Sequence, residues 1–240
     1  MATAKELKEK LFKQKNNGLL KADDATLKAA DAFCEDYKAF LDEAKTEREA
    51  VKASIALAKS AGFTEFDCDK KYKAGDKMYI NNRGKALAIA VIGQKTVDNG
   101  TRIAAAHIDS PRLDLKPNPL YEEAEMALFK THYYGGIKKY QWTAIPLSLH
   151  GVIVRRDGTA VTVSIGEAAD DPIFCITDLL PHLGAKQMQK SASEVIDGEN
   201  LNVLIGSRPL ADDEGGDVVS IIVSGGYAEV GADHVIVLAN

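Results

Sequence analysis

The residues with the clearest capacity for chemistry are His107 and Asp109, which lie two positions apart where the apolar run 102–106 ends. A neutral imidazole is a good zinc ligand, and a nearby carboxylate can accept the N–H of its other nitrogen, which fixes the tautomer. We therefore predict His107 as a metal ligand and Asp109 as the catalytic-site carboxylate that orients it. The spacing by itself also fits a histidine that makes only structural hydrogen bonds, which is the commoner role beside a strand end.

Two short apolar runs, residues 86–92 and 102–106, are predicted to position this pair. The first is bounded by Gly84 and Gly93, and an uninterrupted apolar run of this length is typical of a strand buried on both faces. The proline-containing segment 111–117 then ends regular structure. The sequence thus predicts an α/β layer whose strand ends carry the site, which is where open α/β sheets usually bind ligands.

Helical sequence dominates the N-terminal part of the chain. Residues 4–16 have a helical composition, and between Asp24 and Ala61 apolar side chains recur at helical spacing opposite lysines and glutamates. This second stretch fits one long helix that ends at Gly62, or two helices that meet near Thr46. In either case its apolar stripe predicts core packing.

From Leu120 onward the pattern changes to short β-type runs separated by glycine-containing breaks. Asp157 and Gly158 lie between two β-branched runs, which predicts a hairpin. His132 and His150 lie within such runs, and we expect structural roles for both.

The aromatic and glycine-rich segment 133–142 fits two interpretations. Glycines let the backbone approach a ligand and aromatic side chains supply apolar walls, so the segment could form part of a substrate-facing loop. An ordinary turn with core aromatic residues fits equally well. Asp114, on the strand expected after the site, is interpreted as a solvent-facing residue.

Four segments carry a family resemblance: residues 106–117, 132–142, 146–151 and 205–210. Together they closely resemble the M18, or aspartyl aminopeptidase, family of metalloaminopeptidases, and the resemblance extends from about residue 4 to residue 210. It implies a co-catalytic dinuclear zinc enzyme, with cobalt or manganese as alternative metals, that removes N-terminal residues from peptide substrates. Acidic N-terminal residues are one candidate substrate class.

The same resemblance implies a fold class and a division of the chain. The fold class is α/β, with residues 1–119 as the N-terminal part of a zinc-peptidase catalytic domain. Residues 120–240 would then be a β-rich inserted dimerisation domain whose tail diverges from the family from about residue 211, and such a module implies a homo-oligomer. His182 lies in a region that reaches a partner subunit's active site in related enzymes. A packing or hydrogen-bonding role is the commoner one for such a histidine, and a substrate-binding or subunit-shared role for His182 is the functional alternative.

The ligand set for two metals is incomplete in this sequence. A two-metal peptidase needs bridging and terminal ligands and a glutamate base, and the family motifs that supply them after the inserted module do not occur in these 240 residues. Asp233 and His234 have ligand chemistry, but adjacent strand residues point to opposite faces. We therefore expect the chain alone to be inactive or nearly so. The alternative is a non-catalytic oligomerisation or interaction module derived from such an enzyme.

Composition argues against several other classes. The net charge is −5, with lysines and glutamates interspersed, so we expect neither nucleic acid nor an anionic membrane as a partner. No segment reaches the roughly 18 apolar residues of a membrane span, and the polar N-terminus does not resemble a signal peptide, which predicts a cytoplasmic protein. Three cysteines without Cys-x-x-Cys spacing predict reduced thiols.

Overall fold

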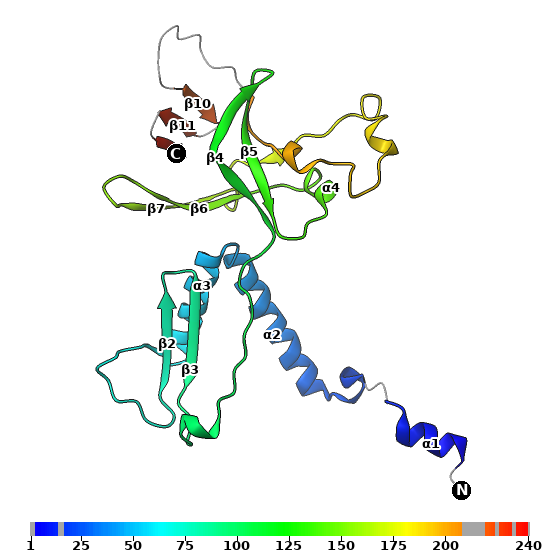
Figure 1. Cartoon of the computed structure of the whole chain (residues 1–240), viewed down its shortest axis with the longest axis vertical. Helices are drawn as coiled ribbons and strands as arrows, with labels where there is room; N and C mark the ends of the chain where they lie inside the picture. The colour runs from blue at the N-terminus through cyan, green and yellow to red at the C-terminus, as the bar shows by residue number, and fades with distance from the viewer. Residues whose placement is uncertain (1–2, 14–16, 208–218, 224–225, 232–233, 240) are drawn as a thin grey trace. The chain divides into compact units, whose positions relative to one another are not determined.

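The computed structural model describes residues 3–13, 17–207, 219–223, 226–231 and 234–239, with side chains described up to residue 207 (Figure 1). The chain divides into two compact units, Met1–Ile103 and Ala104–Asn240. The domain boundary expected between residues 119 and 120 falls inside a strand of the second unit. The predicted boundary separates a catalytic part from an oligomerisation module, and this division by role stays a prediction.

The described residues of the first unit form three α-helices: α1 Ala4–Leu11, α2 Asp24–Glu43 and α3 Glu47–Ser60. Of the two interpretations of the long helical stretch, the one with two helices is confirmed. The break arises because Thr46 caps α3: its hydroxyl accepts the Glu49 N–H at 3.4 Å, and the Glu49 carboxylate accepts the Thr46 N–H at 2.9 Å. This reciprocal arrangement is a capping box, which starts a new helix. No described helix is long and apolar enough to cross a membrane.

A small sheet completes the first unit, with strands β1 Thr64–Glu65, β2 Lys77–Asn82 and β3 Ala86–Val91 in the order β1-β2-β3. β2 and β3 are antiparallel, and the turn between them contains Arg83 and Gly84, both with positive φ. The strand predicted over residues 86–92 is confirmed, but the prediction that it is buried on both faces is wrong: Ile89 is 49% exposed and Val91 58%. Within the described residues β3 pairs only with β2, so its other edge has no strand beside it.

The segment after β3 also differs from expectation. Residues 101–111 form neither helix nor strand, and Ile103 is 84% exposed, so the predicted buried strand 102–106 is wrong. An apolar run becomes a buried strand only where neighbouring strands satisfy its backbone N–H and C=O groups. No strand of the described part of the chain pairs with this run.

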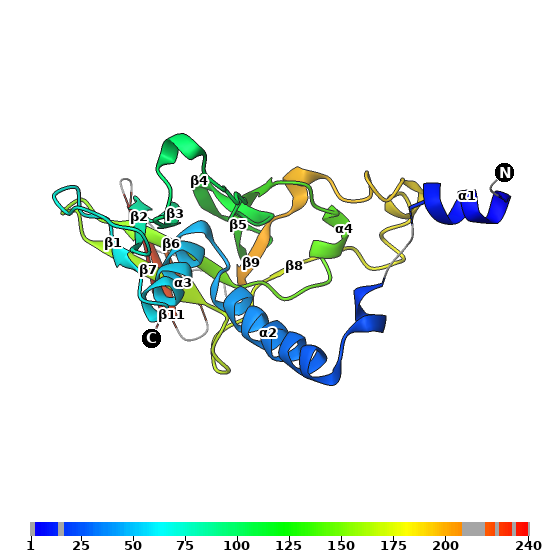
Figure 2. The same ribbon diagram turned by 90° about the horizontal axis from the view of Figure 1, so that it is seen from below.

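The second unit is built on an antiparallel sheet of order β4-β5-β9-β8, whose two long strands can be followed in both views (Figures 1 and 2). The strands are β4 Arg112–Glu123, β5 Met126–Tyr134, β8 Cys175–Ile176 and β9 Val203–Gly206. The register between β4 and β5 shifts between Leu115 and Leu120, where Pro117 and Pro119 lack the N–H that a regular ladder uses.

A hydrophobic core lies against this sheet. Leu201 is fully buried, and Phe129 and Phe174 are 4% and 7% exposed. Trp142, the single tryptophan of the chain, packs against this cluster from the short helix α4 Lys139–Trp142. The second unit therefore encloses a core made of residues from distant parts of its sequence.

The predicted hairpin is confirmed as β6 Leu149–Val154 and β7 Ala160–Ile165. Asp157 accepts the Thr159 N–H, and Gly158 has a φ of 84°, which glycine adopts without strain. Beyond residue 218 the backbone forms an antiparallel sheet of β10 Val219–Val223, β11 Gly226–Gly231 and β12 His234–Ala239. The candidate ligands of the tail, and the divergence expected from residue 211, lie outside the residues whose side chains are described.

Candidate metal-ligand site

His107 lies in the irregular segment that leads into β4, and its side chain is 82% exposed. Its Nδ1 atom lies 2.9 Å from the backbone carbonyl oxygen of Asp109 and 3.2 Å from the Oδ1 atom of the Asp109 carboxylate. Both of these oxygens accept hydrogen bonds, so the arrangement favours a proton on Nδ1. The lone pair of Nε2 is then directed away from Asp109, as a metal ligand requires.

The Asp109 carboxylate is held from its other side by the sheet. The hydroxyl of Tyr134, the last residue of β5, donates a hydrogen bond of 2.7 Å to Oδ2 of Asp109. The pKa of the Asp109 carboxyl lies below its ordinary value, chiefly because of this bond, with smaller contributions from its own backbone amide and from the nearby His107. The carboxylate that faces His107 is therefore kept ionised.

The donor set around His107 fits one metal ligand and not a complete centre. A zinc ion takes at least three protein ligands, and a two-metal centre takes more. Among the described residues, the group of three candidate ligands whose atoms lie within 4.8 Å of one another is Asp67, Cys68 and Asp69, which is exposed, lies in the first unit and does not include His107. No catalytic step through zinc can be derived from this arrangement.

His182 lies in an exposed turn of the second unit, in which the N–H groups of Leu183 and Gly184 both bond to the Leu180 carbonyl. Leu179, Leu180 and Leu183 are also exposed, by 57–65%. In the part of the chain that the structure describes, no contact joins His182 to His107 or Asp109. Its predicted role therefore stays a prediction.

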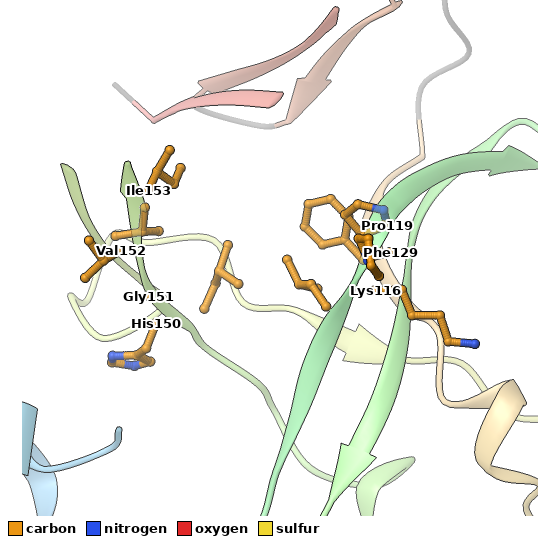
Figure 3. A pocket seen from close by; sticks show the side chains of 11 residues that line it. Lys116, Pro119, Phe129, His150, Gly151, Val152 and Ile153 are labelled. Carbon is orange, nitrogen blue, oxygen red and sulfur yellow. The ribbon is translucent and has the colours of Figure 1, made fainter. Parts of the chain in front are cut away.

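A mostly apolar cavity of about 320 Å³ lies elsewhere in the second unit (Figure 3). Val152 and Ile153 of β6 face it from one side, and Pro119 and Phe129 of the β4–β5 pair face it from the other. Among the described residues that line it there is one histidine, His150, and no carboxylate. The cavity has the walls of an apolar binding site but not the groups that peptide hydrolysis needs.

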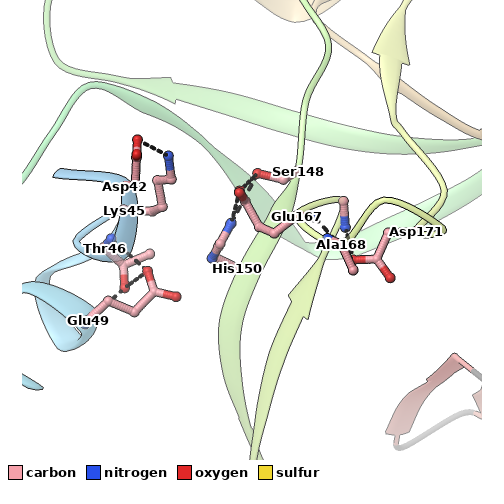
Figure 4. A network of polar contacts seen from close by, with 10 residues as sticks. Asp42, Lys45, Thr46, Glu49, Ser148, His150, Glu167, Ala168 and Asp171 are labelled. Atoms are coloured by element: carbon pink, nitrogen blue, oxygen red, sulfur yellow. Dashed lines mark hydrogen bonds and ion pairs between the residues drawn. The ribbon is translucent and has the colours of Figure 1, made fainter. Parts of the chain in front are cut away.

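His150 belongs to a polar cluster in which it lies 2.9 Å from the Glu167 carboxylate and 3.0 Å from the Ser148 hydroxyl (Figure 4). Ser148 also donates to Glu167 at 2.7 Å. Four residues further on, Asp171 accepts the backbone N–H groups of Gly166, Glu167 and Ala168 at 2.8–3.1 Å. The cluster connects the start of β6 to the turn that follows β7, which agrees with a structural role for His150.

Sequence reasoning missed Tyr134 and Arg112. The Arg112 guanidinium lies 4.3 Å from the centre of the Tyr134 ring and donates to the Asp114 carboxylate at 2.7 Å, so Asp114 is part of an ion pair. Tyr134 falls in the aromatic segment that was interpreted as either a substrate-facing loop or a turn. Strand alternation directs Tyr133 and Tyr134 to opposite faces of β5, but it does not indicate which of the two lies near Asp109.

Solved structures that match this chain include aminopeptidases. The chain superposes on an M18 family aminopeptidase from Thermotoga maritima with a TM-score of 0.76 and 41% identity, covering 85% of this chain and 44% of that one. The mApe1 dodecamer of S. cerevisiae matches with a TM-score of 0.53 at 19% identity, covering 76% of this chain and 39% of that one; this likeness shows the fold alone. The fold is thus that of part of a metalloaminopeptidase.

Sequence comparison shows which family. Residues 40–224 match the family described as Aminopeptidase I zinc metalloprotease (M18). A probable M18 family aminopeptidase 1 from Clostridium acetobutylicum is 50% identical over 208 residues, which are 85% of this chain and 45% of that protein. The chain belongs to the M18 aminopeptidase family, as its motifs predict, and it spans less than half the length of the curated relatives it matches.

Proposed function

We propose that this chain is part of an M18-type zinc metalloaminopeptidase, that it supplies one metal ligand to the complete active site, and that it does not hydrolyse peptides by itself. The observation that carries the proposal is the exposed imidazole of His107, whose Nδ1 atom contacts Asp109 while its Nε2 atom stays available. Family membership supplies the reaction class, the removal of N-terminal residues from peptides, with acidic residues as the first substrates to test. Zinc is the expected metal, and cobalt or manganese suits the same ligands.

Each residue has a defined part in this proposal. His107 offers Nε2 as a ligand, and Asp109 orients the ring and raises the basicity of that nitrogen. The remaining ligands and the general base have to come from residues other than those described here. His182 is the candidate for a substrate-binding or subunit-shared role, because its exposed turn leaves the imidazole accessible to another chain.

The proposed setting is a cytoplasmic homo-oligomer. The S. cerevisiae relative is a dodecamer, which supports testing assembly here, and the β-rich segment 120–240 is the proposed oligomerisation module. The modest negative charge favours neither nucleic acid nor an anionic membrane as a partner.

Chromogenic aspartyl, glutamyl, leucyl and lysyl substrates, offered to the purified chain with zinc, cobalt or manganese, test the proposal. We expect hydrolysis no faster than that by His107→Ala, with the C. acetobutylicum relative as the positive control. Turnover that His107→Ala abolishes would show that this chain or its oligomer completes the centre, and the proposal of an inactive chain would then be wrong.

A second candidate function is a non-catalytic oligomerisation or interaction module derived from such an enzyme. It is favoured by the contrast between the enclosed core of the second unit and the single ligand position at His107. Light scattering coupled to size exclusion separates the two candidates. A stable assembly that binds no zinc supports the module, whereas zinc binding that requires His107 supports the peptidase.

A further inference from the structure

The candidate ligand pair is connected to the sheet of the second unit by a short series of contacts. Arg112 and Tyr134 lie opposite each other in the register of β4 and β5, and the guanidinium of Arg112 covers the Tyr134 ring at 4.3 Å. Arg112 is itself held by Asp114, through a 2.7 Å hydrogen bond from Nε. The ring of Tyr134 is therefore fixed on one face by an arginine that has its own partner.

The Tyr134 hydroxyl in turn holds the Asp109 carboxylate through a hydrogen bond. The two oxygens of the carboxylate have different partners: Oδ2 accepts from Tyr134 at 2.7 Å, and Oδ1 lies 3.2 Å from Nδ1 of His107. A hydrogen bond to a charged acceptor is stronger and more directional than one between neutral groups. With Oδ2 held, rotation of the carboxylate is restricted to orientations in which Oδ1 faces the imidazole.

This restraint matters because the other partner of His107 Nδ1, the Asp109 backbone carbonyl at 2.9 Å, belongs to the same irregular segment as His107. His107 lies in the irregular segment 101–111, and its side chain is 82% exposed. A ligand on such a segment needs an anchor on a rigid element if its ring is to keep one orientation. β5, in the middle of a hydrogen-bonded sheet, is that element.

We propose that Tyr134 is a positioning residue for the candidate ligand, and that it acts through Asp109, with Arg112 holding its ring. In this arrangement Tyr134 keeps Asp109 facing Nδ1, so the proton of the neutral imidazole stays on Nδ1 and Nε2 is presented as the ligand atom. The significance of the pair for catalysis rests on the proposed function, but the orientation itself is a property of this chain. It can be measured without activity or metal.

The measurement is the tautomer of His107 by two-dimensional NMR of the full chain labelled with ¹⁵N-histidine. Spectra are recorded at a pH above which the ¹⁵N shifts of the histidine rings no longer change, so that the neutral tautomers are compared. The signal missing from His107→Ala identifies the residue. In the wild-type protein we expect mainly the Nδ1–H form, and in Tyr134→Phe a fall of about 2- to 10-fold in the ratio of Nδ1–H to Nε2–H, the effect of one hydrogen bond.

Tyr133→Phe is the matched control. Tyr133 is the adjacent residue of the same strand, and its ring stacks on His132 at 5.6 Å. The Tyr133→Phe substitution should leave the His107 tautomer unchanged. A Tyr134→Phe protein whose tautomer equals that of the wild type, or an equal shift in Tyr133→Phe, would overturn the proposal.

A second variant keeps the test decisive if Tyr134→Phe does not fold. Arg112→Met retains the hydroxyl but removes the guanidinium from the ring, and the Nδ1–H population should again fall; an unchanged tautomer would contradict the proposal. Failure here is distinguishable from failure of the proposed function, because the hydrolysis assay with His107→Ala reports on catalysis and the tautomer reports on geometry alone.

Discussion

The two units of the chain differ in how far they bury similar apolar side chains. In the second unit Leu201 is fully buried, within a cluster that includes Phe129 and Phe174. In the first unit the 20-residue helix α2 has no buried residue, although Phe33 and Leu41 lie on its apolar stripe and are 70% and 47% exposed.

The difference in burial depends on which elements pack against these side chains and not on how hydrophobic the side chains are. The core of the second unit is assembled from β5, from β8, and from β9 with the residues just before it. These three parts are separated by tens of positions in the sequence. The first unit buries a smaller set, mainly alanines of α3 together with Val51 and Tyr79. An apolar stripe indicates that a helix can pack against other elements. Whether the stripe is buried depends on which elements of the chain contact it.

Truncating one leucine in each unit tests this difference in burial most directly. Leu201→Ala should lower the free energy of unfolding of the second unit by about 2–5 kcal/mol, because it removes buried methyl groups and leaves a cavity. Leu41→Ala, the matched control on α2, should change it by about 0.5 kcal/mol or less. Trp142 packs on the core, so its fluorescence during urea unfolding reports this unit. Equal losses in both variants would show that the stability of the second unit depends on α2 as much as on its own core.

A smaller effect tests how the core is specified. Thr131 is 2% exposed and is the one polar side chain among the described buried residues. Its hydroxyl donates a hydrogen bond to the Leu201 carbonyl. Thr131→Val keeps the shape but leaves that carbonyl without its partner, at a cost of about 1–3 kcal/mol. Thr131→Ser, which keeps the hydroxyl, should lose less than Thr131→Val in the same Trp142 unfolding experiment. The reverse order would mean that the methyl group matters more than the hydrogen bond.

Local signals in the sequence predicted local structure well. The hairpin at Asp157 and Gly158 is confirmed, and so is the alternative with a helix boundary near Thr46, because turn and capping preferences act over a few residues. Burial was predicted less well: residues 102–106 and β3 have the composition of buried strands, but their burial depends on neighbouring strands that the described residues do not provide.

The candidate site shows the same limit. His107 and Asp109 are in contact in the structure, and their roles as metal ligand and orienting carboxylate stay predictions. Tyr134 could not be predicted as the second partner of Asp109, because its position depends on the register of β4 against β5 and on the path of the chain before Arg112. Long-range register is not encoded in any short motif.

The capping box of α3 offers a prediction for the first unit. Thr46→Ala removes the oxygen that accepts the Glu49 N–H and should cost about 1 kcal/mol (Figure 4). Faster hydrogen exchange of the Glu49 amide measures this loss, and Thr46→Ser should restore most of the protection. The Trp142 unfolding curve of the second unit should not move. A shift of that curve would show that the stability of the second unit depends on this cap.

The smallest expected effect concerns pH and the turn after β7. The pKa of Asp171 lies below its ordinary value because its carboxylate accepts the N–H groups of Ala168, Gly166 and Glu167. A carboxyl whose pKa is lower in the folded state stabilises that state above its unfolded pKa of about 4, and this contribution is lost as the pH falls through the folded pKa.

Asp171→Asn should therefore be less stable than the wild type at pH 6, and the gap should narrow as the pH approaches 3. Asp170→Asn changes the charge equally without removing an acceptor of those three amides, so its difference from the wild type should be smaller at pH 6. Urea midpoints from Trp142 fluorescence across this pH range make the comparison. The sign is the decisive part: a gap that widens on acidification would mean that Asp171 stabilises the turn more when it is protonated, contrary to the hydrogen bonds it accepts.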